Sequence, residues 1–224
     1  MKRIINFVAI AICIAVCISL IPTKSFAQTR PKVLMIPREG YSADLKFMLE
    51  KEVWTMRLML MRAGFKVEAA TASGTTIVSP GIDLKPDLRL DEVKVADYEG
   101  FIMPCMAVGN RPGPPVAPEA VAIVKQAVAE GKPVAAQFGS VTILAQAGVL
   151  KGKKYALFSN PLKANPMQSF IDSRFDGAIY SGRGVVQDGI IITSGVCPFM
   201  EKAFGRPDGT AKLTQAFIAE LKKK

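Results

Sequence analysis

Short runs of consecutive apolar residues alternate along this chain with longer stretches in which apolar residues recur every three or four positions. The runs lie at 33–36, 100–103 and 134–136, and the segment 65–69, in which apolar and charged residues alternate, is predicted to be a further strand. Runs of this length are typical of strands that are buried on both faces, whereas the periodic stretches are typical of amphipathic helices. The pattern predicts helices at 43–63, from 118 to 128, at 141–147 and at 211–221.

Turn-forming residues complete this picture. The segment 75–95 contains Pro80-Gly81 and is predicted to form a hairpin-like excursion, and Asp188-Gly189 predicts a tight hairpin between 184–186 and 190–193. Strands that alternate with helices favour an α/β fold, a three-layer sandwich with a mostly parallel central sheet and helices on both faces. Ligands of such sheets bind beyond the carboxyl ends of the strands. We therefore expect chemistry in the segments 37–40, 104–106, 137–140 and 194–198.

The first 27 residues have the pattern of a secretory signal peptide. Lys2 and Arg3 precede the apolar stretch 7–20, Pro22 breaks it, and a small-x-small pattern at 25–27 predicts a cut near Ala27-Gln28. The mature chain, 28–224, is then expected to form one domain, to be periplasmic or secreted, and to have no stable membrane insertion. The alternative is an uncleaved membrane anchor, because the apolar run is almost long enough to span a bilayer.

Charge and composition exclude several classes of function. Loss of Lys2, Arg3 and Lys24 with the signal peptide lowers the formal net charge of +10 by three, and the remaining basic residues are scattered. Arginines do not interleave with aromatic residues, so we expect no nucleic-acid partner. The chain has no histidine, which excludes Ser-His and Cys-His catalysis and His-ligated metal sites. We expect no cofactor and no metal.

Two cysteines, Cys105 and Cys197, remain after the signal peptide is removed. Each follows a predicted strand on the ligand side of the sheet, so their loops are expected to meet. Three hypotheses stay open: a disulfide, which an exported protein permits; a reactive thiol at a relocated catalytic site; and two unconnected buried thiols.

Four segments together resemble the ThiJ/PfpI superfamily, whose fold is flavodoxin-like and similar to that of class I glutamine amidotransferases. The segments read R-A-G-F-K-V at 62–67, D-Y-E-G-F-I-M-P at 97–104, P-V-A-A to A-G-V-L-K-G over 133–152, and D-G-I-I-I-T-S at 188–194. The third segment looks like the family's nucleophile strand, elbow turn and helix. The resemblance covers nearly all of the mature chain.

The elbow itself departs from the family pattern. Counting along the matched segment places Phe138 where the family has its nucleophilic cysteine, Gly139 where a histidine often follows, and Ser140 where the elbow usually has glycine. Phenylalanine cannot act as a nucleophile. Either Phe138 packs into the former pocket or the turn has relaxed. Ser140 could replace the nucleophile only with an unusual base, and is expected to cap the following helix.

Two further positions bear on the site. Met106 stands where the family's P-G-G loop has a glycine, so a side chain replaces open backbone in the predicted pocket with Phe138, Gly139 and Ser140. Glu52 falls where the family has an acid that contacts the nucleophile. Glu52 is either a buried acid or base in the pocket or an ordinary helix carboxylate that pairs with Lys51 or Arg57.

The leading hypothesis is an exported pseudoenzyme that binds a small molecule or a protein near Glu52, Phe138 and the two cysteine loops. The first alternative is a hydrolase or a glyoxalase- or deglycase-like enzyme that uses Glu52 with a relocated Cys105 or Cys197. The second is a thiol redox or stress-response protein of the cell envelope. A homodimer is implied by analogy with family members.

Overall fold

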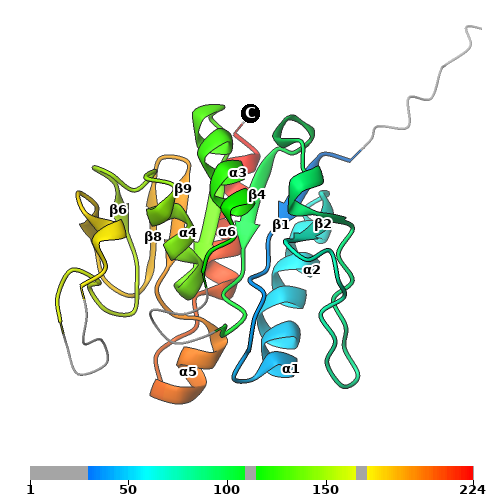
Figure 1. Cartoon of the computed structure of the whole chain (residues 1–224), viewed down its shortest axis with the longest axis horizontal. Coiled ribbons are helices and arrows are strands. Elements are labelled where there is room, and N and C mark those ends of the chain that lie inside the picture. The colour runs from blue at the N-terminus through cyan, green and yellow to red at the C-terminus, as the bar shows by residue number, and fades with distance from the viewer. Residues whose placement is uncertain (1–29, 109–114, 165–170, 224) are drawn as a thin grey trace, which may run out of the picture.

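The structure, a computed structural model, describes residues 30–108, 115–164 and 171–223. A seven-stranded sheet has the order β3-β2-β1-β4-β5-β9-β8 (Figure 1). The strands are β1 (Lys32–Met35), β2 (Lys66–Thr71), β3 (Leu88–Arg89), β4 (Gly100–Met103), β5 (Val134–Gln137), β8 (Val185–Asp188) and β9 (Ile191–Ser194). Neighbouring strands are parallel, except that β8 pairs antiparallel with β9. The predicted hairpin around Asp188-Gly189 is confirmed.

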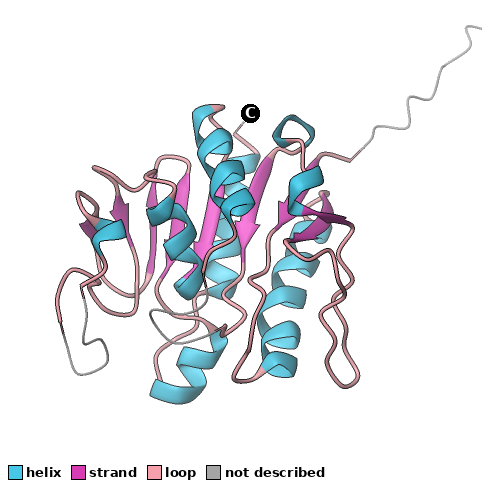
Figure 2. Ribbon diagram, in the orientation of Figure 1, coloured by secondary structure: helices cyan, strands magenta, loops and turns pink. Residues whose placement is uncertain are grey.

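Helices cover both faces of this sheet (Figure 2). On one face lie α1 (Leu45–Met48), the π-helical turn η1 (Leu49–Val53), α2 (Trp54–Arg62) and α6 (Thr210–Leu221), and α2 packs on α6. On the other face α3 (Pro118–Ala129) packs against α4 (Val141–Gln146). The helix α5 (Pro198–Phe204) contacts α1 beyond the carboxyl ends of the strands (Figure 1).

The shorter elements lie around this frame. They are the 3-10 turns η2 (Leu90–Glu92), η3 (Val95–Asp97), η4 (Phe138–Ser140) and η5 (Ser173–Phe175), and the strands β6 (Lys154–Tyr155) and β7 (Ile179–Tyr180), which pair parallel in a second, two-stranded sheet. These two strands therefore do not join the main sheet.

Alternation along the strands divides the core into two layers. In β1, Val33 and Met35 pack with the α2 and α6 side, whereas Leu34 packs with the α3 and α4 side. Successive side chains of a strand point to opposite faces, so a continuous apolar run fills both layers at once. The expected three-layer α/β sandwich with a mostly parallel sheet is confirmed.

The predicted helix at 43–63 is present, but it begins at Leu45 and contains the π-helical turn. Apolar residues lie on two sides of this helix. Val53, Met56 and Leu60 are buried, whereas Trp54, Leu58 and Met61 are each about two-fifths exposed or more. The predicted excursion at 75–95 folds back on itself through an antiparallel bridge between Ile77 and Leu84.

The signal peptide and its cleavage site lie outside the described residues. In the part of the chain that the structure describes, no helix combines the length and the apolarity needed to cross a membrane.

Candidate functional site

The elbow turn keeps a strained backbone although it carries no nucleophile. β5 ends at Gln137, η4 follows at once, and Phe138 has a φ of 40°. A side chain in this left-handed region costs roughly 1–2 kcal/mol relative to right-handed backbone. Phe138 packs edge-on against Phe158, with ring centroids 6.3 Å apart. The turn has therefore not relaxed, and the phenyl ring packs among apolar neighbours.

A separate apolar cluster, here called the elbow cluster, surrounds this turn. It is made of buried residues from α1, from α5 and from the loops after β4, β9 and β6, with three phenylalanines packed against it: Met48, Cys105, Ala107, Phe158, Val196, Cys197 and Met200, with Phe47, Phe138 and Phe199. These side chains occupy the carboxyl ends of the central strands, where an α/β enzyme usually binds its substrate.

Glu52 lies fully buried beneath the loop that follows β4. Its two carboxylate oxygens accept hydrogen bonds from the backbone N–H groups of Cys105 and Met106, each at 2.8 Å. Burial and the neighbouring Cys105 raise the pKa of Glu52 well above its ordinary value, against the effect of the two N–H donors. Glu52 is thus a buried group beside the elbow and not a surface carboxylate that pairs with Lys51 or Arg57.

The hydrogen bonds of Glu52 explain the shape of this loop. Met106 and Ala107 have φ values of 61° and 50°, so two successive non-glycine residues are left-handed. Such backbone persists only where the surroundings determine it strongly. The Glu52 carboxylate, together with the hydrogen bond from the Ser42 hydroxyl to the Met106 carbonyl at 2.6 Å, supplies that constraint.

Cys105 and Cys197 meet beside the elbow as two buried free thiols. The prediction that their loops meet is confirmed, because the two side chains are hydrogen-bonded. Burial raises the pKa of Cys105, but hydrogen bonds from Cys197 and from the N–H groups of Gly139 and Ala107, together with the charge of Arg38, lower it overall. Burial and the interaction with Cys105 raise the pKa of Cys197 well above its ordinary value. Cys105 is therefore the first of the two to ionise.

Gly139 and Ser140 have structural roles in this arrangement. A Cβ on Gly139 would lie 2.9 Å from the Arg38 guanidinium and 3.5 Å from the Cys105 sulfur, so glycine permits their close approach. Ser140 is buried, and its hydroxyl donates to the Pro104 carbonyl at 2.6 Å. Ser140 stands at the N-cap position of α4, as expected, but its hydroxyl makes no capping hydrogen bond because it is turned toward the neighbouring loop.

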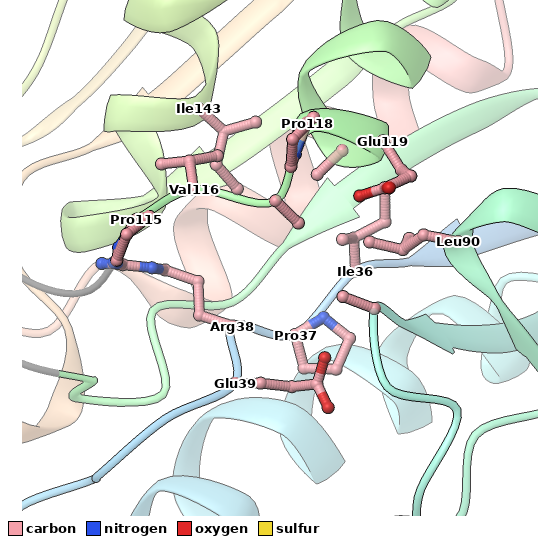
Figure 3. A pocket seen from close by; sticks show the side chains of 13 residues that line it. Ile36, Pro37, Arg38, Glu39, Leu90, Pro115, Val116, Pro118, Glu119 and Ile143 are labelled. Atoms are coloured by element: carbon pink, nitrogen blue, oxygen red, sulfur yellow. The ribbon is translucent and has the colours of Figure 1, made fainter.

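A cavity of about 320 Å³ opens next to the elbow, on the α3 and α4 side of the sheet (Figure 3). It is lined by residues that follow β1, β2 and β3, by the start of α3 and the residues before it, and by one residue from α4: Ile36, Pro37, Arg38, Glu39, Ala72, Leu90, Pro115, Val116, Ala117, Pro118, Glu119, Ala120 and Ile143. The residues expected to form a pocket, Met106, Phe138, Gly139 and Ser140, are not among them. The segment 37–40 was expected to border a ligand site, and three of its residues line this cavity.

Arg38 links the two regions, although the sequence did not single it out. Its Nη1 donates to the carbonyl oxygens of Val108 and Gly139, each at 3.4 Å, while its side chain also lines the cavity. Burial lowers the pKa of Arg38, Cys105 acts against this and raises it, and the nearby Arg174 lowers it. The signal available in the sequence was its position directly after a buried strand.

Gln137 is a second residue that sequence reasoning missed. Its buried amide Nε2 donates to the Val196 carbonyl at 2.9 Å, to Thr210 at 2.9 Å and to Asp208 at 3.0 Å. The bond to Val196 joins the last residue of β5 to the loop after β9, which carries Cys197, and the other two bonds join it to the start of α6. Within the described ranges, no group of three or more His, Cys, Asp or Glu side chains is arranged to hold a metal ion.

The sequence pattern of the DJ-1/PfpI family matches residues 44–203. The chain belongs to the DJ-1/PfpI family. An uncharacterised protein of Archaeoglobus fulgidus is 34% identical over 140 residues, which are 60% of this chain and 75% of that protein. A deglycase of Pyrococcus horikoshii is 34% identical over 93 residues, which are 38% of this chain and 51% of that enzyme.

Solved structures show the same fold. The crystal structure of a ThiJ/PfpI domain protein from Brachyspira murdochii superposes with a TM-score of 0.60 over 88% of this chain and 98% of that one, at 16% identity. At this identity the similarity establishes only the fold, and the function has to be inferred from the geometry of the site.

Proposed function

We propose that this protein is a non-catalytic member of the DJ-1/PfpI family that binds a small molecule in the cavity beside the elbow. The observation that carries the proposal is that the elbow position holds a phenylalanine and that the reactive groups beside it are buried. Phe138 stands at its strained position, and Glu52, Cys105 and Cys197 are at most 1% exposed. A nucleophile must contact its substrate, and these groups are enclosed by the elbow cluster.

The cavity supports the binding part of the proposal. Its volume of about 320 Å³ is within the range usual for small-molecule sites, which are concave and mostly apolar with a few polar groups. Arg38, Glu39 and Glu119 are the charged groups on its wall. The remaining lining side chains are aliphatic or proline.

We further propose that residues 1–27 direct export and are removed, so that the protein acts in the periplasm or outside the cell. The basic start, apolar stretch and small-x-small site support this. Amino-terminal sequencing of protein recovered from a periplasmic extract is expected to begin at Gln28. A first residue of Met1, in a membrane fraction, would instead indicate an uncleaved anchor.

Thermal unfolding in the presence of a metabolite set tests the binding function. Any compound that binds only the folded state raises the unfolding temperature. Ala72 is exposed and lines the cavity, so Ala72→Trp is expected to fill it and abolish the stabilisation. Ala203→Trp, at an exposed position of α5, is the matched control and is expected to keep it. If no compound stabilises the wild type, or if Ala72→Trp has no effect, the cavity is not the binding site.

Assays with α-oxoaldehydes and esters test the enzymatic alternative, which is motivated by the deglycase among the relatives. We expect no turnover above that of the Cys105→Ser variant. Turnover that disappears in both Cys105→Ser and Glu52→Gln would overturn the non-catalytic proposal.

The contact between the two thiols favours one second candidate, a thiol redox function. Oxidation would join the Cys105 and Cys197 sulfurs, which already contact each other, with loss of two protons and two electrons to a disulfide oxidant. Thiol counts on denatured protein from glutathione redox buffers test this. If both thiols disappear in the monomeric protein and return when reductant is added, Cys105 and Cys197 form a reversible dithiol–disulfide couple. Two thiols that persist under oxidising conditions would exclude it.

A further inference from the structure

The thiols of Cys105 and Cys197 lie against each other within the elbow cluster. Their side chains are hydrogen-bonded, both residues are at most 1% exposed, and they do not form a disulfide. In such a contact a proton lies between two sulfur atoms. A metal ion that prefers sulfur ligands can take the place of this proton after a small adjustment of the two side chains, so it needs no preformed cavity.

The surroundings of the two thiols favour a soft metal ion. The elbow cluster contains two further sulfur atoms, in the side chains of Met48 and Met200, and is otherwise aliphatic and aromatic. Among the described residues, no third His, Cys, Asp or Glu completes a group with the two cysteines. Calcium and magnesium need several oxygen ligands, and structural zinc needs a full tetrahedral set. Thiolate and thioether sulfur instead select Cu(I).

The charges beside the thiols match a monovalent ion. Cu(I) bound to two thiolates carries one net negative charge. The Arg38 guanidinium interacts favourably with the Cys105 thiolate, which also accepts hydrogen bonds from the N–H groups of Gly139 and Ala107. Cys197 accepts from a backbone N–H of α5. These groups stabilise negative charge on the two sulfurs, as residues around a metal site commonly do.

Glu52 acts in the opposite direction, because its negative charge disfavours the thiolates of both cysteines. Two features limit this opposition. Both carboxylate oxygens are engaged by backbone N–H groups, and burial raises the pKa of Glu52, which favours its neutral form. Arg38 and the N–H donors therefore face an acid whose charge is weakened.

We propose that the reduced protein binds one Cu(I) ion between the sulfur atoms of Cys105 and Cys197. On binding, each thiol loses its proton, two copper–sulfur bonds form, and no electron is transferred. The site is separate from the cavity, so the inference does not depend on the proposed ligand-binding function. It departs from the expectation of no metal, which was based on the absence of histidine and did not consider a pair of thiols in contact.

Anaerobic competition with the Cu(I) chelator bicinchoninate tests the proposal. The protein is the full chain with Cys13→Ser and Cys17→Ser, which removes the other two thiols of the sequence, and Cu(I) alone is the probe. We expect one ion per chain and slow loading, because both sulfurs are buried. X-ray absorption is expected to show sulfur ligands. An oxygen or nitrogen ligand shell, or no binding in competition with the chelator, would overturn the proposal.

Substitution of each cysteine identifies the ligands. Cys105→Ala and Cys197→Ala are each expected to weaken Cu(I) binding by more than about a hundredfold, the upper end of the effect for residues that only support a ligand. Met56→Leu, which changes a buried methionine in the other layer of the core, is the control and is expected to bind as the parent protein does. Cysteine variants that fold and keep full affinity would show adventitious copper binding and overturn the site.

Arg38→Gln tests the same site without removing a ligand. Loss of the guanidinium charge is expected to weaken Cu(I) binding about tenfold, whereas Arg57→Gln, whose side chain lies over Trp54, should leave it unchanged. If the cysteine variants do not fold, this pair decides, and equal affinities of Arg38→Gln and Arg57→Gln overturn the proposal. Excess Zn(II) is expected not to displace the copper, since two thiols do not supply a tetrahedral set. Displacement by Zn(II) would contradict the assignment to Cu(I).

Discussion

The elbow and the cavity are neighbours at the carboxyl edge of one sheet, yet they differ in every property that matters for a ligand. The elbow has the strained backbone and the buried acid of a reactive site, but apolar side chains fill it. The cavity has charged groups that are exposed or half-buried, and it is open. The difference shows that the backbone of a catalytic elbow can be kept even where the open space for a ligand is a neighbouring cavity.

Side-chain size explains the contrast. Phe138, Met48 and Phe158 occupy the elbow region, whereas Ala72, Ala117 and Ala120 line the cavity. The strained turn also has a structural use, because it aims the N–H of Gly139 at the Cys105 sulfur. Strain alone therefore does not identify an active site in this chain.

The largest expected effect is a difference in stability between variants of two carboxylates, Glu52 at the elbow and Glu119 at the cavity. Glu52→Ala leaves two buried N–H groups unpaired and is expected to lower the free energy of unfolding by about 3 kcal/mol. Glu119→Ala removes an exposed side chain and is expected to change it by less than about 0.5 kcal/mol. Urea unfolding of both variants measures this. Equal effects would mean that Glu52 does not hold the loop, and the contrast between the regions would fail.

The second effect concerns the packed elbow. Phe138→Ala is expected to cost about 2 kcal/mol through lost packing, since the ring is only partly buried. Phe138→Gly is expected to be about 1 kcal/mol more stable than Phe138→Ala, because glycine adopts positive φ without strain. Both variants should raise the alkylation rate of Cys105 at least tenfold. A glycine variant less stable than the alanine variant would show that the turn is not strained in solution.

The third prediction compares Glu52 with Glu68, a buried carboxylate whose partners are lysine side chains and a tyrosine hydroxyl. Glu68 accepts from Lys66 at 2.6 Å and from the Tyr98 hydroxyl at 2.8 Å. Burial raises its pKa, but hydrogen bonds from Lys66, Tyr98 and Lys32 lower the pKa of Glu68 to about 2.

Because the folded-state pKa of Glu68 is depressed, its stabilisation is present at neutral pH and is lost as pH falls from about 4.5 toward 2. We expect this stabilisation to be about 1–2 kcal/mol, because the side chains of Lys32 and Lys66 are open to solvent, which screens the ion pairs. Glu68→Gln should remove this acid dependence. For Glu52 the sign is opposite: its raised pKa favours folding at acid pH, and stability falls as pH rises above about 4.5. Identical pH profiles for Glu68→Gln and Glu52→Gln would contradict this difference.

The smallest effect tests the link between the regions. Removing the Arg38 charge is expected to raise the pKa of Cys105, because that charge favours the thiolate. Thiolate ultraviolet absorbance against pH measures the shift in Arg38→Gln. Arg57→Gln, whose guanidinium instead lies over Trp54, is the control. An unchanged titration in Arg38→Gln would mean that the elbow and the cavity are electrostatically independent.

The sequence predicted much of the fold because local patterns encode it. Continuous apolar runs such as 33–36 require burial on both faces, and Asp188-Gly189 encodes a hairpin through turn geometry. The π-helical turn at Leu49–Val53, which contains the buried Glu52, could not be predicted from the apolar periodicity of the helix.

The site was predictable in part. Position along the strands indicated that the loops of Cys105 and Cys197 would meet, and the segment match placed Phe138 at the elbow. Nothing in the spacing indicated that Glu52 would bind backbone N–H groups, that the Ser140 hydroxyl would turn to Pro104, or that Arg38 would reach Gly139. These contacts join residues far apart in the chain.

The sequence by itself determined the α/β class, the edge of the sheet where ligands belong, and the absence of histidine chemistry and of an elbow nucleophile. It did so because apolar periodicity and residue identity are local properties. Only the tertiary structure decided that the elbow is filled and that the adjacent cavity is open with Arg38 and Glu119 at its ends. Which space is filled depends on how side chains from separate segments pack together, and no single segment contains that information.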